Sequence, residues 1–144
     1  MAPDEEMGKI LRRTKIFQIA FLGIVLTYII ILIVFLSYSG FTPPFASDDP
    51  FLTPLVAALG GLAAISLAIG VYVPRRMIKK SRKPQDLFRP HIVRCVIFCS
   101  PAHYGLIMGI LGVERLIILP FFIVAAGALI LTFPTKERWR QMLE

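Results

Sequence analysis

Four apolar segments dominate this chain of 144 residues and restrict the folds that it can adopt. They cover residues 16–38, 52–73, 91–111 and 116–133. A helix needs about 20 apolar residues to cross the hydrocarbon core of a bilayer, and each segment is close to that length or longer. Because lipid offers no hydrogen-bond partners, the backbone of each separate segment has to bond to itself as a helix. The sequence therefore predicts an all-α, polytopic membrane protein with four transmembrane helices.

The composition agrees with this fold class. Hydrophobic residues make up 56% of the chain and charged residues 17%, and the mean hydropathy is +0.73. A soluble domain averages about 45–50% apolar and about 25% charged residues. The segments leave only short connectors, so we interpret residues 1–144 as a single integral membrane domain without a separate catalytic domain.

Basic residues predict the orientation of the helices. They gather before the first segment, in a loop at residues 74–90, and in a C-terminal stretch at residues 135–144. The connector at residues 39–51 has none. Loops rich in lysine and arginine stay on the cytoplasmic side of a membrane. We therefore expect both termini in the cytoplasm, with the chain in the inner (cytoplasmic) membrane of a bacterium or archaeon.

The same basic residues suggest partners. The net charge of +7 belongs to one predicted membrane face, where anionic lipid headgroups attract each basic side chain by about 1 kcal/mol. The residues that we expect at the headgroups are Arg75, Arg76, Lys79 and Lys80. Docking of an acidic protein is the alternative. Nucleic acid is not expected, because the basic loop has no interleaved aromatic residue beyond Phe88.

The second segment is rich in small residues, whereas the first carries bulky branched ones. Small side chains let helix backbones approach closely in lipid, where packing drives helix association. The residues that we expect at such helix contacts are Ala57, Gly60, Gly61, Ala64 and Gly70. The second helix should therefore be buried against neighbours from this chain or another, and the first should lie at the periphery.

Four metal-capable side chains recur at every fourth residue of the third segment. They are His91, Cys95, Cys99 and His103. On a helix this spacing forms one stripe, but the stripe spans about 18 Å, so one ion could take at most two adjacent ligands. The chain has no further histidine or cysteine, so we expect no cofactor within it. Cys95, Cys99 and His103 remain candidates for a metal or haem site shared with another subunit.

His103 and Tyr104 place polar groups near the middle of the third segment, beside Pro101. Intramembrane histidine is costly unless it faces a partner or water. Our first interpretation is a structural histidine at a kink, because Pro101 removes one helical hydrogen bond. The partners that we consider are Tyr28, Thr27, Ser66 and a carbonyl near Ile97 freed by Pro101. A proton relay is the alternative, although the sequence supplies no second titratable group for it.

The C-terminal stretch predicts a short cytoplasmic helix at residues 135–144. Thr135 follows Pro134 and is suited to cap the first turn of this helix. Trp139 is then expected at the headgroup level as an interfacial anchor. A frayed tail without a regular helix is the alternative.

Part of the third segment resembles a known family. Residues 99–112, CSPAHYGLIMGILG, are similar to the carboxylate-bearing helix of the rotary ATPase proteolipids, through Ala102, Tyr104, Gly105 and Leu106. In that alignment the ion-binding glutamate of the family falls on Cys99, so the resemblance does not carry ion translocation with it. The chain looks more like uncharacterised small bacterial four-helix membrane proteins with such a third helix. That resemblance implies a fold and no activity.

No arrangement typical of an enzyme is present in the sequence. We find no intramembrane carboxylate pair, no Ser-His-Asp set and no glycine-rich phosphate loop. We therefore expect a non-catalytic accessory or structural subunit of a larger membrane complex, in contact with lipid and other membrane subunits. A proteolipid-like homo-oligomer or transport component is one alternative, and a metal- or haem-binding membrane subunit is another.

Overall fold

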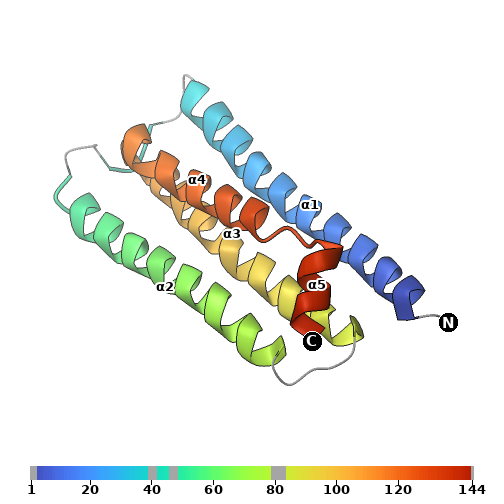
Figure 1. The fold of residues 1–144 in the computed structure, drawn as a ribbon. Coiled ribbons are helices and arrows are strands. Elements are labelled where there is room, and N and C mark those ends of the chain that lie inside the picture. Colours follow the sequence, from blue (N-terminus) through green and yellow to red (C-terminus); the bar gives the residue numbers. More distant parts are fainter. Residues whose placement is uncertain (1–2, 39–41, 46–48, 79–83, 144) are drawn as a thin grey trace.

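The computed structural model describes residues 3–38, 42–45, 49–78 and 84–143, and this part of the chain forms helices and turns without a strand (Figure 1). The elements are α1 (Pro3–Ser37), α2 (Leu52–Ile78), the 3-10 helix η1 (Pro84–Leu87), α3 (Phe88–Leu111), α4 (Arg115–Leu131) and α5 (Lys136–Leu143). The predicted all-α class is confirmed. Among the described residues, α1, α2 and α3 are long and apolar enough to cross a membrane, and α4 is a shorter apolar helix of 17 residues.

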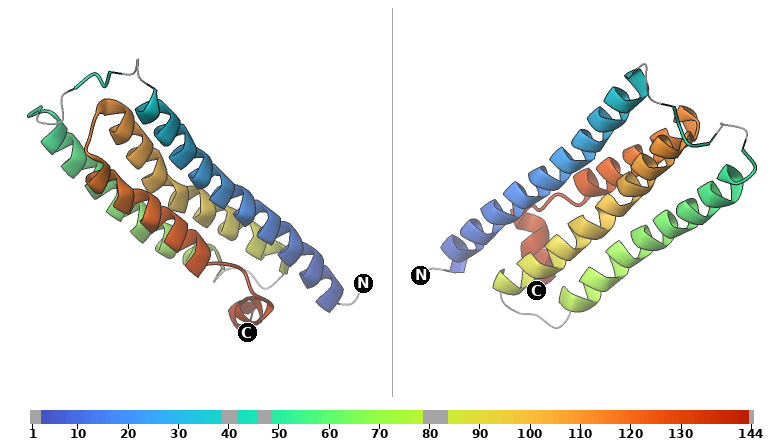
Figure 2. Two further views of the ribbon diagram at one scale, coloured as in Figure 1. Left: turned by 90° about the horizontal axis from the view of Figure 1, so that it is seen from above. Right: turned by 180° about the vertical axis from the view of Figure 1, so that it is seen from behind.

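Helix α3 is the centre of the bundle. It lies between α1 and α2, with α4 packed against it on one face (Figure 2). Glycines on α3 permit these approaches: a Cβ atom at Gly105 would lie 3.1 Å from Phe122 of α4, and one at Gly109 would overlap Leu32 of α1. The main core therefore follows α3.

A left-handed glycine closes the turn between α3 and α4. Gly112 has φ of 100°, its N–H donates to the carbonyl of Gly109, and the N–H of Val113 donates to Met108 at 3.0 Å. This pattern satisfies the last carbonyls of a helix and favours glycine. The turn sends α4 back along α3 as an antiparallel neighbour.

Helix α1 begins well before the predicted apolar segment. Its inner side repeats at alternating steps of four and three residues, which extends the core-facing side into the charged N-terminal stretch. The buried members are Met7, Leu11, Thr14, Gln18, Val25 and Leu32. Many of the apolar side chains between them are exposed along the membrane part of α1, in agreement with the expected peripheral position, and others flank the core. Helix α1 therefore begins before the apolar segment because one of its sides is buried there, and not because of the overall hydropathy of the N-terminal stretch.

A second, smaller core lies at the end of the bundle where the basic residues gather. It consists of Met7 and Leu11 of α1, Leu87 of η1 and Trp139 of α5. Thr135 caps α5 as predicted, because its hydroxyl accepts a hydrogen bond from the N–H of Arg138 at 3.3 Å. Trp139, however, is only 2% exposed. The predicted headgroup anchor is therefore wrong, because the indole is covered by protein rather than facing lipid.

The predicted basic loop at residues 74–90 is largely helical. Helix α2 continues through the buried Pro74 to Ile78, and α3 already starts at Phe88. Ile78 packs against the second core, and this contact stabilises the extra turn of α2. Lys79 and Lys80 lie outside the described residues.

Both termini of the chain lie at one end of the bundle, together with the connection from α2 to α3 (Figure 1). Arg75 and Arg94 are found at the same end. Among the described residues, most basic side chains therefore lie at this end, whereas Arg115 begins α4 at the opposite end, beside Ser37.

Candidate functional site

The small residues of α2 divide into two groups. A Cβ atom at Gly70 would lie 2.8 Å from Cδ1 of Phe98, so α2 contacts α3 closely there. Ala57, Gly61 and Ala64 are instead exposed, and a Cβ atom at Gly61 would meet nothing within 4 Å. Of the predicted small packing residues of α2, Gly70 therefore makes the close contact within this chain, and Ala57, Gly61 and Ala64 stay uncovered.

An apolar groove of about 230 Å³ runs beside that uncovered face. It lies between α2 and α4, with α3 as its floor. The residues that line it are Gly60, Ala63, Ala64, Leu67, Pro101, Pro120, Phe121 and Val124. Two prolines and several small residues make the groove shallow and smooth, which suits contact with a helix.

His103 is hydrogen-bonded at both ring nitrogens. Its Nδ1–H donates to the carbonyl of Cys99 at 3.1 Å, and its Nε2 accepts from the hydroxyl of Tyr28 at 2.7 Å. The rings of His103 and Tyr28 also meet edge to face, with centroids 4.8 Å apart. Tyr28 was among the predicted partners, whereas the carbonyl is that of Cys99 rather than the one near Ile97. The pair satisfies a polar group on the lipid-facing side of α1 and α3.

Replacing Tyr28 with phenylalanine is expected to lower the free energy of unfolding by about 0.6 kcal/mol, the average worth of one interhelical hydrogen bond in a membrane. The change removes only the Tyr28 hydroxyl, which donates a hydrogen bond to His103. Unfolding in mixed micelles of dodecyl maltoside and sodium dodecyl sulfate measures the loss. Tyr104→Phe is the matched control, because no hydrogen bond to its hydroxyl occurs among the described residues. Equal losses in both variants would contradict this role for Tyr28.

The two cysteines lie inside the core. Cys95 has no exposed surface, and Cys99 is 2% exposed with its thiol donating to the carbonyl of Phe21 at 3.8 Å. Within the described residues, no three histidine, cysteine or acidic side chains come together as a metal site. A site shared with a partner through Cys95 and Cys99 would require the helices to separate. His103 could join such a site only by losing its hydrogen bond with Tyr28.

His91 takes part in a buried chain of hydrogen bonds that links three helices. Gln18 of α1 donates its amide to the carbonyl of Leu129 on α4, and its Oε1 accepts from Nε2 of His91 on α3 at 2.7 Å. Gln18 has no exposed surface. The sequence analysis missed Gln18, although its place in the repeat with Leu11 and Thr14 marks it as an inward polar residue.

The C-terminal end of α4 is satisfied by side chains. The hydroxyl of Thr132 donates to the carbonyl of Ala128 at 2.7 Å, and Nη1 of Arg138 donates to the carbonyl of Leu131 at 2.7 Å. With Gln18 on Leu129, these bonds replace the partners that the last turn of a helix lacks. A cation at this end also complements the helix dipole.

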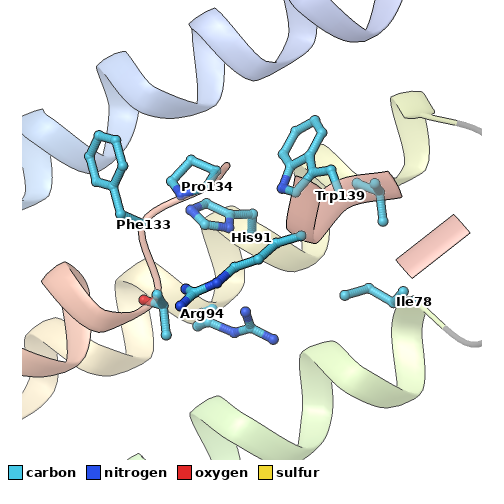
Figure 3. Close-up of a pocket in the computed structure, with 9 residues that line it drawn as sticks. Ile78, His91, Arg94, Phe133, Pro134 and Trp139 are labelled. Carbon is cyan, nitrogen blue, oxygen red and sulfur yellow. The ribbon is translucent and has the colours of Figure 1, made fainter. Parts of the chain in front are cut away.

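Two connected cavities open beside this helix end. The smaller one, of about 70 Å³, is surrounded by His91 and Arg94 of α3, Trp139 of α5 and Ile78 of α2 (Figure 3). The larger one, of about 440 Å³, shares several of the same walls. Its lining residues are Val71, Arg75, Ile78, Arg94, Phe98, Thr132 and Arg138. Three arginines from three helices therefore border one pocket.

Of the residues predicted at lipid headgroups, the two that the structure describes behave differently. Arg75 lines the larger pocket, whereas Arg76 stacks over the ring of Tyr72 at 5.0 Å from its centroid. Neighbouring arginines on α2 thus point to different surroundings.

Comparison with known proteins finds no relative: no family model matches the chain, and neither a curated protein nor a solved structure is similar enough to count as a match. The functional argument therefore rests on the residues and geometry above.

Proposed function

We propose that this chain is a non-catalytic accessory subunit of a larger membrane protein complex, and that the outer face of α2 binds a transmembrane helix of a different protein. The observation that carries the proposal is the uncovered small-residue surface of α2 beside the α2–α4 groove. Between helices in lipid, small residues are favoured where backbones approach closely. If Ala57, Gly61 and Ala64 faced only lipid, these small residues would make no close contact with another helix.

The proposal includes four membrane crossings with both termini in the cytoplasm. Helix α4 is about 26 Å long at 1.5 Å per residue, slightly short of the roughly 30 Å hydrocarbon core. Its end is supplied with hydrogen bonds by Gln18 and Arg138, which supports a helix that ends near the depth of the membrane surface. The gathering of both termini and the basic residues at one end supports the cytoplasmic assignment.

A non-catalytic role is supported by the state of the polar groups within the bundle. His91, Cys99 and His103 of α3 each bond to a residue of α1. These bonds hold helices together and occupy the groups that a reaction would use. The inner membrane of a bacterium or archaeon is the proposed location, with the basic end of the bundle on the cytoplasmic side.

Replacing Gly61 with leucine is expected to remove the partner protein while leaving the chain folded, because a Cβ atom at this position meets nothing within 4 Å, whereas leucine would block a close helix approach. The measurement is co-purification of other membrane proteins with the tagged full-length chain after mild detergent extraction. Gly23→Leu is the matched control: Gly23 lies on α1, is exposed, and also has open space around it. Wild type and Gly23→Leu should retain the same partner, and Gly61→Leu should lose most of it.

Three outcomes would contradict the proposal. A partner that remains bound to Gly61→Leu would place the interface elsewhere. A uniform assembly of this chain alone would favour the alternative of a proteolipid-like homo-oligomer or transport component. Visible absorption from haem, lost together with His103, would support the metal- or haem-binding alternative instead.

A further inference from the structure

Three arginine side chains converge on one pocket without a balancing acid. Arg75 comes from α2, Arg94 from α3 and Arg138 from α5, and all three line the cavity of about 440 Å³. None of its lining residues is acidic. The charges of Arg75 and Arg94 are close enough to repel one another. A pocket of this kind has an excess of positive charge that none of its lining residues neutralises.

One of the three arginines is held by a hydrogen bond to the backbone, and another is half-buried. Nη1 of Arg138 donates to the carbonyl of Leu131, which fixes the guanidinium at the end of α4 and leaves its other donors free. Arg94 is half-buried on α3, and no carboxylate pairs with it in the described part of the chain. A half-buried cation without a partner is unfavourable, so an anion in the pocket would be stabilised.

Apart from Thr132, whose hydroxyl donates to the carbonyl of Ala128, the remaining walls of the pocket are apolar. Val71 and Ile78 of α2 and Phe98 of α3 form them, and Phe98 belongs to the core of the bundle. The pocket thus joins a cationic end to an apolar side that faces the membrane part of α2 and α3. This combination matches an amphiphile, with an acidic head and an acyl chain, better than a small soluble anion.

Phosphate is the acidic group that the arginines fit best. A guanidinium offers a planar fork of donors that matches phosphate oxygens, and several such bonds can form at once. Basic pockets between membrane helices on the cytoplasmic side bind phospholipid headgroups in this manner. We infer that the pocket bordered by Arg75, Arg94 and Arg138 binds the phosphate of an anionic phospholipid, whose acyl chain lies along Val71 and Phe98.

The test uses neighbouring arginines of α2 as a matched pair. Arg75 lines the pocket, and Arg76 stacks on Tyr72 outside it. The purified full chain in dodecyl maltoside is titrated with dioleoyl phosphatidylglycerol, and bound lipid is counted by native mass spectrometry. Arg75→Gln should weaken binding by about tenfold, the worth of one charge-assisted hydrogen bond. Arg76→Gln should change binding by less than about twofold.

Further arms separate the pocket from general surface charge. Trp139 is the single tryptophan of the chain and lines the adjoining cavity, so its fluorescence should change saturably with the lipid and not in Arg94→Gln. Dioleoyl phosphatidylcholine should bind about tenfold more weakly, because its headgroup is neutral overall. Equal binding of both lipids, or equal effects of Arg75→Gln and Arg76→Gln, would overturn the inference. If millimolar inorganic phosphate displaced the lipid, the inference that the phosphate group belongs to a lipid would be contradicted.

Discussion

Replacing Gly70 with leucine is expected to lower the free energy of unfolding by about 3 kcal/mol, at the upper end for an overpacked contact. The backbone of α2 lies directly against the ring of Phe98, and a Cβ atom at Gly70 would also lie 3.1 Å from Ile97. Phe98 is itself 2% exposed and belongs to the core of the bundle. Leucine would therefore push α2 away from α3 at its closest contact. Unfolding in mixed detergent micelles measures the change.

Gly61→Leu is the control for this prediction. It makes the same substitution on the same helix, where a Cβ atom meets nothing within 4 Å. Its effect on the isolated chain should stay below about 0.5 kcal/mol, as for a surface substitution. Comparable losses in both variants would show that leucine disturbs α2 by itself, and the described contact between Gly70 and Phe98 would then be incorrect.

Replacing Gln18 with leucine is expected to lower the free energy of unfolding by about 2–3 kcal/mol, because a buried polar partner is left without its hydrogen bond. Nε2 of His91 would lose its acceptor, and the carbonyl of Leu129 would keep only the long bond from Thr132 at 3.3 Å. The leucine side chain would otherwise fill a similar space between α1, α3 and α4. The same unfolding assay measures the loss.

A second substitution distinguishes the hydrogen bond from the packing. In the double variant Gln18→Leu with His91→Leu, both partners are apolar, and most of the lost stability should return. The two single changes are then strongly non-additive, as expected for residues in direct contact. Additive losses would mean that Gln18 and His91 stabilise the fold independently, which contradicts the buried chain of hydrogen bonds.

The helices were predictable from the length and hydropathy of the apolar segments, because a backbone in lipid has few alternatives. Their ends were not. Helix α1 starts at Pro3 because Met7 and Leu11 pack against Trp139, and α2 passes through Pro74 because Ile78 packs beyond it. Both extensions depend on contacts between distant parts of the chain, and hydropathy within one segment does not contain them.

The candidate site was predictable only in part, and for a similar reason. Tyr28 was among the partners expected for His103, since few polar groups exist at that depth. The partners of Gln18 and Arg138 are backbone carbonyls of α4. Every residue has a backbone carbonyl. The sequence therefore does not indicate which carbonyls will lack a helical hydrogen bond and lie near a polar side chain. The convergence of Arg75 and Arg94 likewise depends on the packing of α2 on α3.

The interface proposed for α2 is tested most directly by photo-crosslinking in the native membrane. A photoreactive residue at Ala64 would face the groove between α2 and α4, and one at Ile19 would point outward from α1, where 58% of the side chain is exposed. The proposal predicts a discrete adduct between the Ala64 position and one other membrane protein, identified by mass spectrometry, with no such adduct from Ile19. An adduct at Ala64 with another copy of this 16.1 kDa chain, or with no protein at all, would contradict it.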